Sequence, residues 1–142
     1  VDSSKKKTDS LKEIITSIKF KNDIFVINDR IENIGRQSSF KNGFNIATAR
    51  AVSNPSTVSE YILPMLKSNG LGILYCGKWT NEDNKNLEHT LKALKGKILE
   101  IKSNFLPREK GIRNAIFIKP KASCPDIYPR SIGKAEKYPL KG

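Results

Sequence analysis

The apolar positions of the chain follow two periods that alternate along the sequence. Between Lys6 and Ile18 they recur with the i, i+3, i+4, i+7 spacing of an amphipathic helix, at Leu11, Ile14, Ile15 and Ile18. Three short apolar runs follow and predict buried strands, at Ile24–Ile27, Phe44–Ala49 and Leu71–Cys76. Helical and strand patterns in alternation favour an α/β fold built on a mostly parallel sheet.

A second helix is predicted between the last two of these strands. Asn54 precedes Pro55, which is the pairing of an N-cap residue with proline at the first helical position. We expect this helix to run to about Leu66 and to bend or end early at Pro64. The residues Lys67–Gly70 then predict a turn into the next strand.

The third helix and the last two strands complete the pattern. Thr80 and Asp83 have the spacing of a capping box, and the helix that they would start carries leucines on one face, at 87, 91 and 94. Two longer strands are predicted at Lys97–Phe105 and Arg113–Lys119. Because no helix separates these two strands, we expect an antiparallel pair at one edge of the sheet.

From Pro120 onward the periodicity is lost. Residues 120–142 contain prolines and basic residues without a helical or strand pattern. We therefore expect residues 1–119 to form one domain and residues 120–142 to form an extended basic tail.

Composition and charge narrow the class of function. The chain has 142 residues, enough for one domain, and 37% hydrophobic residues, which argues against a disordered protein. Its 26 Lys and Arg exceed its 14 Asp and Glu, giving a net charge of +12. An excess of this size favours partners rich in phosphate, although a solvated lysine-rich surface is the alternative.

No metal site or membrane segment is predicted. Cys76, Cys124 and the single histidine, His89, do not have the spacing of zinc ligands. No apolar run approaches the roughly 18 residues that cross a bilayer, and no signal peptide is recognisable. We expect a reduced, cytoplasmic setting without a membrane partner.

Residues that follow the predicted strands are the candidates for chemistry, because ligands of α/β sheets bind at the carboxyl ends of the strands. Asp2 could hold ribose hydroxyls or cap the first helix, and Glu32 could hold a ligand or be a surface carboxylate. Arg50 stands between two alanines at a strand end. Burying an arginine there would require an anionic or carbonyl partner, so we favour a functional role for Arg50.

A series of motifs in order along the chain resembles the GidB family. The motifs are VDSSKKK, NDRIENIG, FNIATARAV, LPMLKSNG, YCGK, GIRNAIFIK and YPRSIGKAEKYPL. Members of this family are S-adenosylmethionine-dependent methyltransferases that modify guanine N7 in the small-subunit (16S) ribosomal RNA. The resemblance implies a Rossmann-like class I methyltransferase sheet. It also implies that the chain corresponds to the C-terminal larger part, an incomplete sheet without the family's first strand and glycine-rich turn.

The resemblance assigns roles by position. It implies that the cofactor S-adenosylmethionine is bound by residues near its ribose and adenine and by the arginine of the Arg-Ala-Val motif, namely Asp2, Ser3, Ser4, Ile31, Glu32 and Arg50. Arg50 also faces the substrate, with Arg30 and Arg113 as further catalytic arginines. Asn114 stands where members commonly have histidine. Guanine N7 has a free lone pair, so it can attack the methyl group without a general base.

The implied partner is small-subunit ribosomal RNA, free or in a 30S-type particle. We expect its phosphates to be bound by basic residues after the third predicted strand and in the tail: Lys78, Arg130, Lys134 and Lys137. A basic RNA- or ribosome-binding module without catalysis is the alternative, and a class I methyltransferase acting on another nucleic acid is a third interpretation. Because the strand Phe44–Ala49 would have an unpaired edge, we expect residues 1–142 alone to be molten and inactive.

Overall fold

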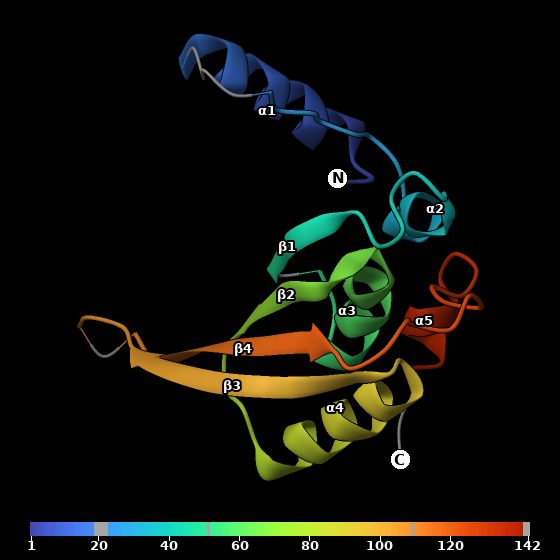
Figure 1. Cartoon of the computed structure of the whole chain (residues 1–142). Helices are drawn as coiled ribbons and strands as arrows, with labels where there is room; N and C mark the ends of the chain where they lie inside the picture. Colours follow the sequence, from blue (N-terminus) through green and yellow to red (C-terminus); the bar gives the residue numbers. More distant parts are fainter. Residues whose placement is uncertain (19–22, 51, 109, 141–142) are drawn as a thin grey trace.

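A four-stranded mixed sheet forms the centre of the computed structural model (Figure 1), which describes residues 1–18, 23–50, 52–108 and 110–140. The strands are β1 (Phe44–Arg50), β2 (Leu66–Cys76), β3 (Gly96–Phe105) and β4 (Ile112–Pro120), in the order β1-β2-β4-β3. β1 and β2 are parallel, whereas β4 is antiparallel to both β2 and β3. The predicted α/β sheet with an antiparallel last pair is confirmed, but the expectation of a mostly parallel sheet is wrong, because among these four strands only β1 and β2 are parallel.

Helices α3 (Pro55–Ile62) and α4 (Asn81–Ala93) begin where the sequence predicts. The Asn54 side chain accepts a hydrogen bond from the backbone N–H of Thr57 at 3.0 Å. Pro64 lies in a single 3₁₀ turn, Leu63–Met65, that ends this helical segment. At the start of α4, Thr80 and Asp83 exchange the hydrogen bonds of a capping box. Both starts are local interactions, which is why the sequence reveals them.

The core lies between one face of the sheet and these two helices. Leu74 of β2 and Ile116 of β4 are paired across the strands, and both side chains are buried. They pack in one cluster with the buried leucines of the helical segments, Leu63, Leu87, Leu91 and Leu94. Each such side chain contributes roughly 1.5–3 kcal/mol when it is removed from water.

The other face of the sheet remains open to solvent. Ile46 of β1 is 59% exposed and Tyr75 of β2 is 49% exposed. These side chains alternate with the core-facing residues, so they point away from α3 and α4. β1 is the outermost strand on its side of the sheet, which confirms the exposed edge predicted for this strand.

The N-terminal segment differs most from the prediction. Helix α1 (Lys5–Ile18) forms as expected, but it projects from the sheet (Figure 1) and its Leu11, Ile14 and Ile18 are exposed. The strand predicted at Ile24–Ile27 is wrong: these residues are not in the sheet, and Phe25 is 82% exposed. An apolar run becomes a strand only beside a partner, and within the described residues β1 pairs with β2 alone.

The turn predicted at Lys67–Gly70 is also wrong, because β2 already begins at Leu66. Phe44 lies opposite Leu66 and Ile46 opposite Leu71, so the segment forms an irregularity within the β1–β2 pair. Gly70 is needed there, since a Cβ atom would lie 2.9 Å from the carbonyl oxygen of Phe44. The turn-forming residues therefore produce a bulge.

The last segment packs against the domain and contains a short helix, α5 (Lys134–Lys137). Ala135 and Tyr128 are buried in the main core cluster. Thr57 of α3 donates a hydrogen bond to the carbonyl oxygen of Ala135 at 3.1 Å. Arg36, at the end of α2 (Ile31–Arg36), donates one to the carbonyl oxygen of Pro129 at 3.0 Å. The described residues of 120–142 are thus part of the fold and not an extended arm.

Candidate cofactor and RNA site

Several of the predicted basic residues meet at the carboxyl edge of β1 and β2. Arg50, the last residue of β1, lies directly opposite Tyr75. Cys76, the last residue of β2, lies opposite Asn114, and Arg113 precedes Asn114 on the antiparallel strand β4. The topology therefore brings the ends of β1 and β2 and the start of β4 to one edge of the sheet. Lys78 lies just beyond the end of β2.

Arg50 is exposed, so water solvates its guanidinium and the cost of burying it, from which its functional role was argued, does not apply. β1 is an outer strand, and the register gives Arg50, Tyr75 and Ala115 the same open face. Arg113 lies two residues before Ala115 and therefore points to this face as well. The edge offers two solvated guanidinium groups beside an exposed aromatic ring, which suits an anionic or aromatic ligand.

Asn114 organises the loop after β2. It is 3% exposed, its amide nitrogen donates to the carbonyl oxygen of Gly77, and its amide oxygen accepts from the Ser103 hydroxyl at 2.6 Å. These contacts hold the loop that carries Lys78. Sequence reasoning noted Asn114 only as a replacement for histidine. The available signal was an amide side chain at a core-facing position of an apolar strand.

Asp2 lies at the turn before α1, next to the segment that leads into α2. Its backbone N–H donates to the carbonyl oxygen of Ile27 at 3.1 Å, and the Asn28 amide donates to the Asp2 carbonyl at 3.0 Å. One carboxylate oxygen accepts from the backbone N–H of Ser4 at 2.8 Å. The other lies 3.8 Å from the Lys7 ammonium, and the side chain is partly exposed. Asp2 therefore stabilises the turn and keeps one oxygen accessible.

Glu32 is buried, 1% exposed, which excludes the surface-carboxylate interpretation. One carboxylate oxygen accepts from the Arg30 guanidinium at 3.0 Å, the Tyr61 hydroxyl at 3.3 Å and the Gly133 N–H at 3.0 Å. The other oxygen has no hydrogen-bond partner among the residues that the structure describes. Burial favours a higher pKa for Glu32, but the hydrogen bonds from Arg30 and Gly133 outweigh it and hold the pKa below its usual value.

The same contacts change the ionisation of both side chains that meet Glu32. The hydrogen bond to Glu32 raises the pKa of Arg30, and burial together with the Glu32 charge raises the pKa of Tyr61 to about 12. Glu32 is thus a buried anion that joins α2, α3 and the C-terminal segment. One of its carboxylate oxygens is occupied within the protein and the other is buried, so the backbone of Ile31 and Glu32 is what remains for a ligand.

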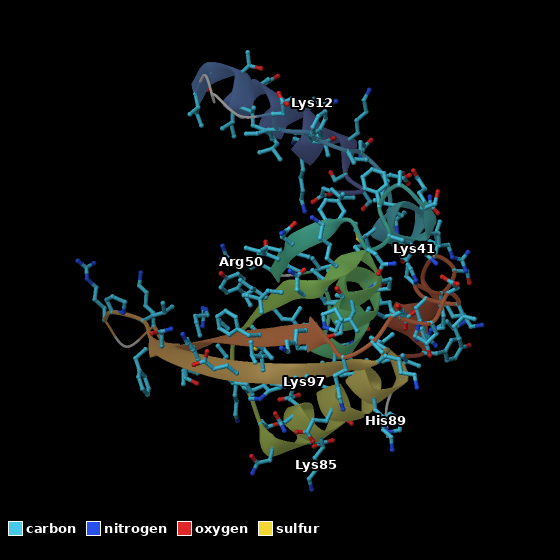
Figure 2. All side chains as sticks on the ribbon, viewed as in Figure 1. Lys12, Lys41, Arg50, Lys85, His89 and Lys97 are labelled. Carbon is cyan, nitrogen blue, oxygen red and sulfur yellow. The ribbon has the colours of Figure 1, made fainter. Side chains whose placement is uncertain are left out.

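The predicted cofactor residues do not all come together. Asp2, with Ser3 and Ser4 in the same turn, adjoins the segment that leads to Ile31 and Glu32. The residues Val1 and Ile24–Ile27 line one pocket with Phe44, the first residue of β1, whereas Arg50 is the last. A strand of this length spans roughly 20 Å. Figure 2 likewise shows Arg50 at the opposite end of β1 from Lys41, which follows α2.

The basic residues predicted in the C-terminal segment have different surroundings. Lys134 and Lys137 of α5 are exposed. Arg130 forms a two-point ion pair with the buried Glu60, with Nε 2.9 Å from one carboxylate oxygen and Nη2 2.6 Å from the other. Hydrogen bonding to Glu60 raises the pKa of Arg130. Arg130 is therefore engaged in the fold, and the RNA role of all three residues stays a prediction.

Comparison with known proteins decides the family. Residues 1–111 match the family model described as GidB, rRNA small subunit methyltransferase G. The chain belongs to the GidB family. This confirms the resemblance read from the motifs of the sequence.

Individual relatives support the same family. The chain is 94% identical over 142 residues to "Ribosomal RNA small subunit methyltransferase G" of Prochlorococcus marinus subsp. pastoris, covering 100% of the chain and 59% of the relative. It is 40% identical over 140 residues to the protein of that name from Prochlorococcus marinus strain NATL2A, covering 99% of the chain and 56% of the relative. The chain thus spans less than two thirds of the length of these relatives.

A solved structure supports the fold. A putative methyltransferase from Thermoplasma acidophilum matches 87% of the chain and 56% of its own length, with a TM-score of 0.50 and 17% identity. This likeness supports a Rossmann-like fold. In the described residues no helix is long and apolar enough to cross a membrane. The same residues contain no group of three or more His, Cys, Asp or Glu placed to hold a metal ion.

Proposed function

We propose that the protein takes part in the S-adenosylmethionine-dependent methylation of guanine N7 in small-subunit ribosomal RNA, in the cytoplasm where ribosomes assemble. Membership of the GidB family supports the reaction class. The observation that best supports an RNA base as the substrate is the exposed pair of Arg50 and Tyr75. These two residues lie directly opposite each other at the carboxyl edge. A guanidinium beside an aromatic ring suits an unpaired base, which can stack on the ring.

For the cofactor, Asp2 provides the best-fitting group. Its accessible carboxylate oxygen would accept hydrogen bonds from ribose hydroxyls, while Ser3 and Ser4 form the same turn. The backbone of Ile31 and Glu32 would border the adenine, held in place by the buried Glu32 carboxylate. When bound, S-adenosylmethionine supplies an electrophilic methyl group.

The arginines would hold the RNA substrate in position, and they would not transfer protons. Arg50 would donate to guanine O6 and leave the N7 lone pair free, a variation on the usual two-point contact. Tyr75 would stack on the base. Arg113 and Lys78 would hold phosphates at the same edge, and Arg30, partly exposed beside Glu32, would do so near the cofactor segment. Because N7 carries no proton, alignment with the methyl group is the main requirement.

The test is a methyl-transfer assay with labelled S-adenosylmethionine and small-subunit ribosomal RNA, made in a full-length family member that carries these residues, because the 142 residues alone are expected to be inactive. We expect Arg50→Ala to lower methyl transfer about 100-fold, because small misplacements of reacting groups have effects of this size. Arg108→Ala is the matched control, since Arg108 is also exposed but lies in the loop between β3 and β4. Equal activity of the Arg50 variant and the control would contradict the proposal.

A second candidate, an RNA-binding module without catalysis, is favoured by one observation. Val1, which precedes Asp2, lines a pocket with Phe44 at the start of β1, whereas Arg50 ends that strand, so the 142 residues by themselves separate the cofactor turn from the arginine that would hold the base. The same assay separates the two functions. RNA binding without methyl transfer and without cofactor binding by calorimetry would support the binding module.

A further inference from the structure

Five lysines gather at the base of the β3–β4 hairpin, far from the edge that carries Arg50. Lys97 of β3 lies directly opposite Lys119 of β4. Lys95 and Lys121 stand just outside the two strands, and Lys92 lies in the last turn of α4. We refer to these five residues as the hairpin lysine cluster.

The backbone holds the cluster together. The carbonyl oxygen of Lys95 accepts hydrogen bonds from the backbone N–H groups of Lys121, at 2.8 Å, and Ala122, at 3.2 Å. Lys95 has a left-handed backbone conformation, with φ of 59°, where the chain leaves α4 for β3. Directly opposite residues such as Lys97 and Lys119 have Cβ atoms about 4.5–5.5 Å apart. The fold therefore places Lys97 beside Lys119 and Lys95 beside Lys121.

The fold does not neutralise these charges. None of the five lysines takes part in an ion pair within the described residues. The C-terminal end of α4 favours cations and accounts for Lys92 and Lys95. It does not account for Lys97 opposite Lys119, because like charges that face each other across a sheet are destabilising. An external anion would remove this repulsion.

The position of the cluster indicates what the anion belongs to. Lys119 and Arg113 are six residues apart on β4, so both point to the open face of the sheet, roughly 20 Å from each other. Figure 2 shows Lys97 on β3 well separated from Arg50 on β1. Positive side chains therefore stand at both ends of one open face, which suits a long polyanion that spans the face.

We propose that the hairpin lysine cluster binds the phosphodiester backbone of structured RNA, as a second contact remote from the residues that orient the base. This inference rests on the proposed function and extends it by a separate contact surface. Lysine ammonium groups are compact point charges without base selectivity, so they position RNA and do not read its sequence. Each neutralised phosphate releases counterions and increases the salt dependence of binding.

The test compares Lys97→Gln/Lys119→Gln with the unchanged protein. RNA binding is measured by fluorescence anisotropy with a labelled small-subunit RNA fragment, at nanomolar protein and a series of salt concentrations. Loss of two phosphate contacts should lower the slope of log affinity against log salt by about 1.4–1.8 and weaken binding about tenfold or more at 0.1 M salt. The thermal midpoint should stay the same or rise, because the variant removes like-charge repulsion.

The matched control is Lys12→Gln/Lys85→Gln, which removes the same net charge from exposed positions on α1 and α4. Figure 2 shows both control lysines away from Lys97. An equal change of slope in the control would overturn the proposal, because general charge would then explain the effect. Binding of anionic lipid vesicles in preference to RNA would overturn it too.

The outcomes also separate this inference from the proposed function. If the unchanged protein binds RNA and the cluster variant keeps the same slope, only the cluster proposal fails. If the unchanged protein binds no RNA, the proposed function fails as well. A reduced slope with cofactor binding unchanged would support the cluster as a contact for RNA alone.

Discussion

At the scale of single residues, the surroundings of Arg50 and Glu32 depend on the position of a strand in the sheet and on residues far away in sequence. Arg50 was expected to need an anionic or carbonyl partner because alanines flank it, but its strand is at the edge of the sheet and leaves it exposed. Glu32 was expected at the surface or beside adenine, yet its partners include Tyr61 and Gly133, far away in sequence. Burial of one side chain depends on neighbours that the local sequence does not specify.

The buried pair of Glu60 and Arg130 gives a prediction at this scale. Glu60→Gln should lower the free energy of unfolding by about 3–5 kcal/mol, because it leaves the largely buried Arg130 charge without its partner. Urea denaturation followed by circular dichroism measures the loss. Asp126→Asn is the control, since Asp126 pairs with Lys41 but its side chain is almost fully exposed, and it should have little effect. Similar losses in both variants would contradict the prediction.

Glu32 predicts an acid-sensitive contribution to stability. Its folded-state pKa is lowered, so its contribution is complete above the unfolded pKa of about 4.3 and is lost as pH falls through the folded value. Urea midpoints between pH 7 and pH 3 should therefore fall less steeply at acid pH for Glu32→Gln than for the unchanged protein. The variant should also be less stable at pH 7. If the urea midpoints of the two proteins fall with pH in parallel, ionisation of Glu32 does not contribute to stability.

At the scale of elements, the local capping signals gave correct predictions, whereas the strand at Ile24–Ile27 and the turn at Lys67–Gly70 were predicted wrongly. The caps at Asn54 and Thr80 involve residues three positions apart, and both were found as predicted. The apolar run Ile24–Ile27 has the composition of a strand, but it has no partner in the sheet. The turn-like residues after Leu66 became a bulge because β1 pairs alongside them. Sequence composition therefore predicts what a segment can form, and its neighbours decide whether it does.

Close packing of α3 against the sheet predicts the effect of adding one methyl group to β2. A Cβ atom at Gly72 would lie 2.7 Å from Cγ1 of Ile118 and 3.0 Å from Cδ1 of Ile62. Gly72→Ala should therefore lower the free energy of unfolding by about 1–3 kcal/mol. Gly77→Ala is the matched control, because nothing lies within 4 Å of a Cβ atom there. A thermal midpoint of the Gly72 variant equal to that of the control would refute the close approach.

At the scale of the whole molecule, the fold has one well-packed face and one open face. The sequence predicted the α/β class, the antiparallel last pair and the exposed edge of Phe44–Ala49, because these follow from the order of helices and strands. It did not predict that α1 projects from the sheet with its apolar stripe exposed. The spacing of apolar residues in a helix shows that one face is apolar, but it does not show what that face packs against.

The open face and the edge of β1 predict self-association. A strand edge with unpaired backbone groups and exposed apolar residues such as Ile46 and Phe44 can pair with another copy. We expect the 142-residue chain to bind a hydrophobic dye and to form oligomers at tens of micromolar in sedimentation velocity. Ile46→Lys should reduce both without lowering the thermal midpoint, because Ile46 is mostly exposed and a charged side chain on an edge strand opposes pairing. Leu99→Lys, on the far edge strand β3, should change them less, since Leu99 lies at the irregularity of the β3–β4 pair. If the unchanged chain is monomeric and binds no hydrophobic dye, the prediction that this face drives self-association is wrong.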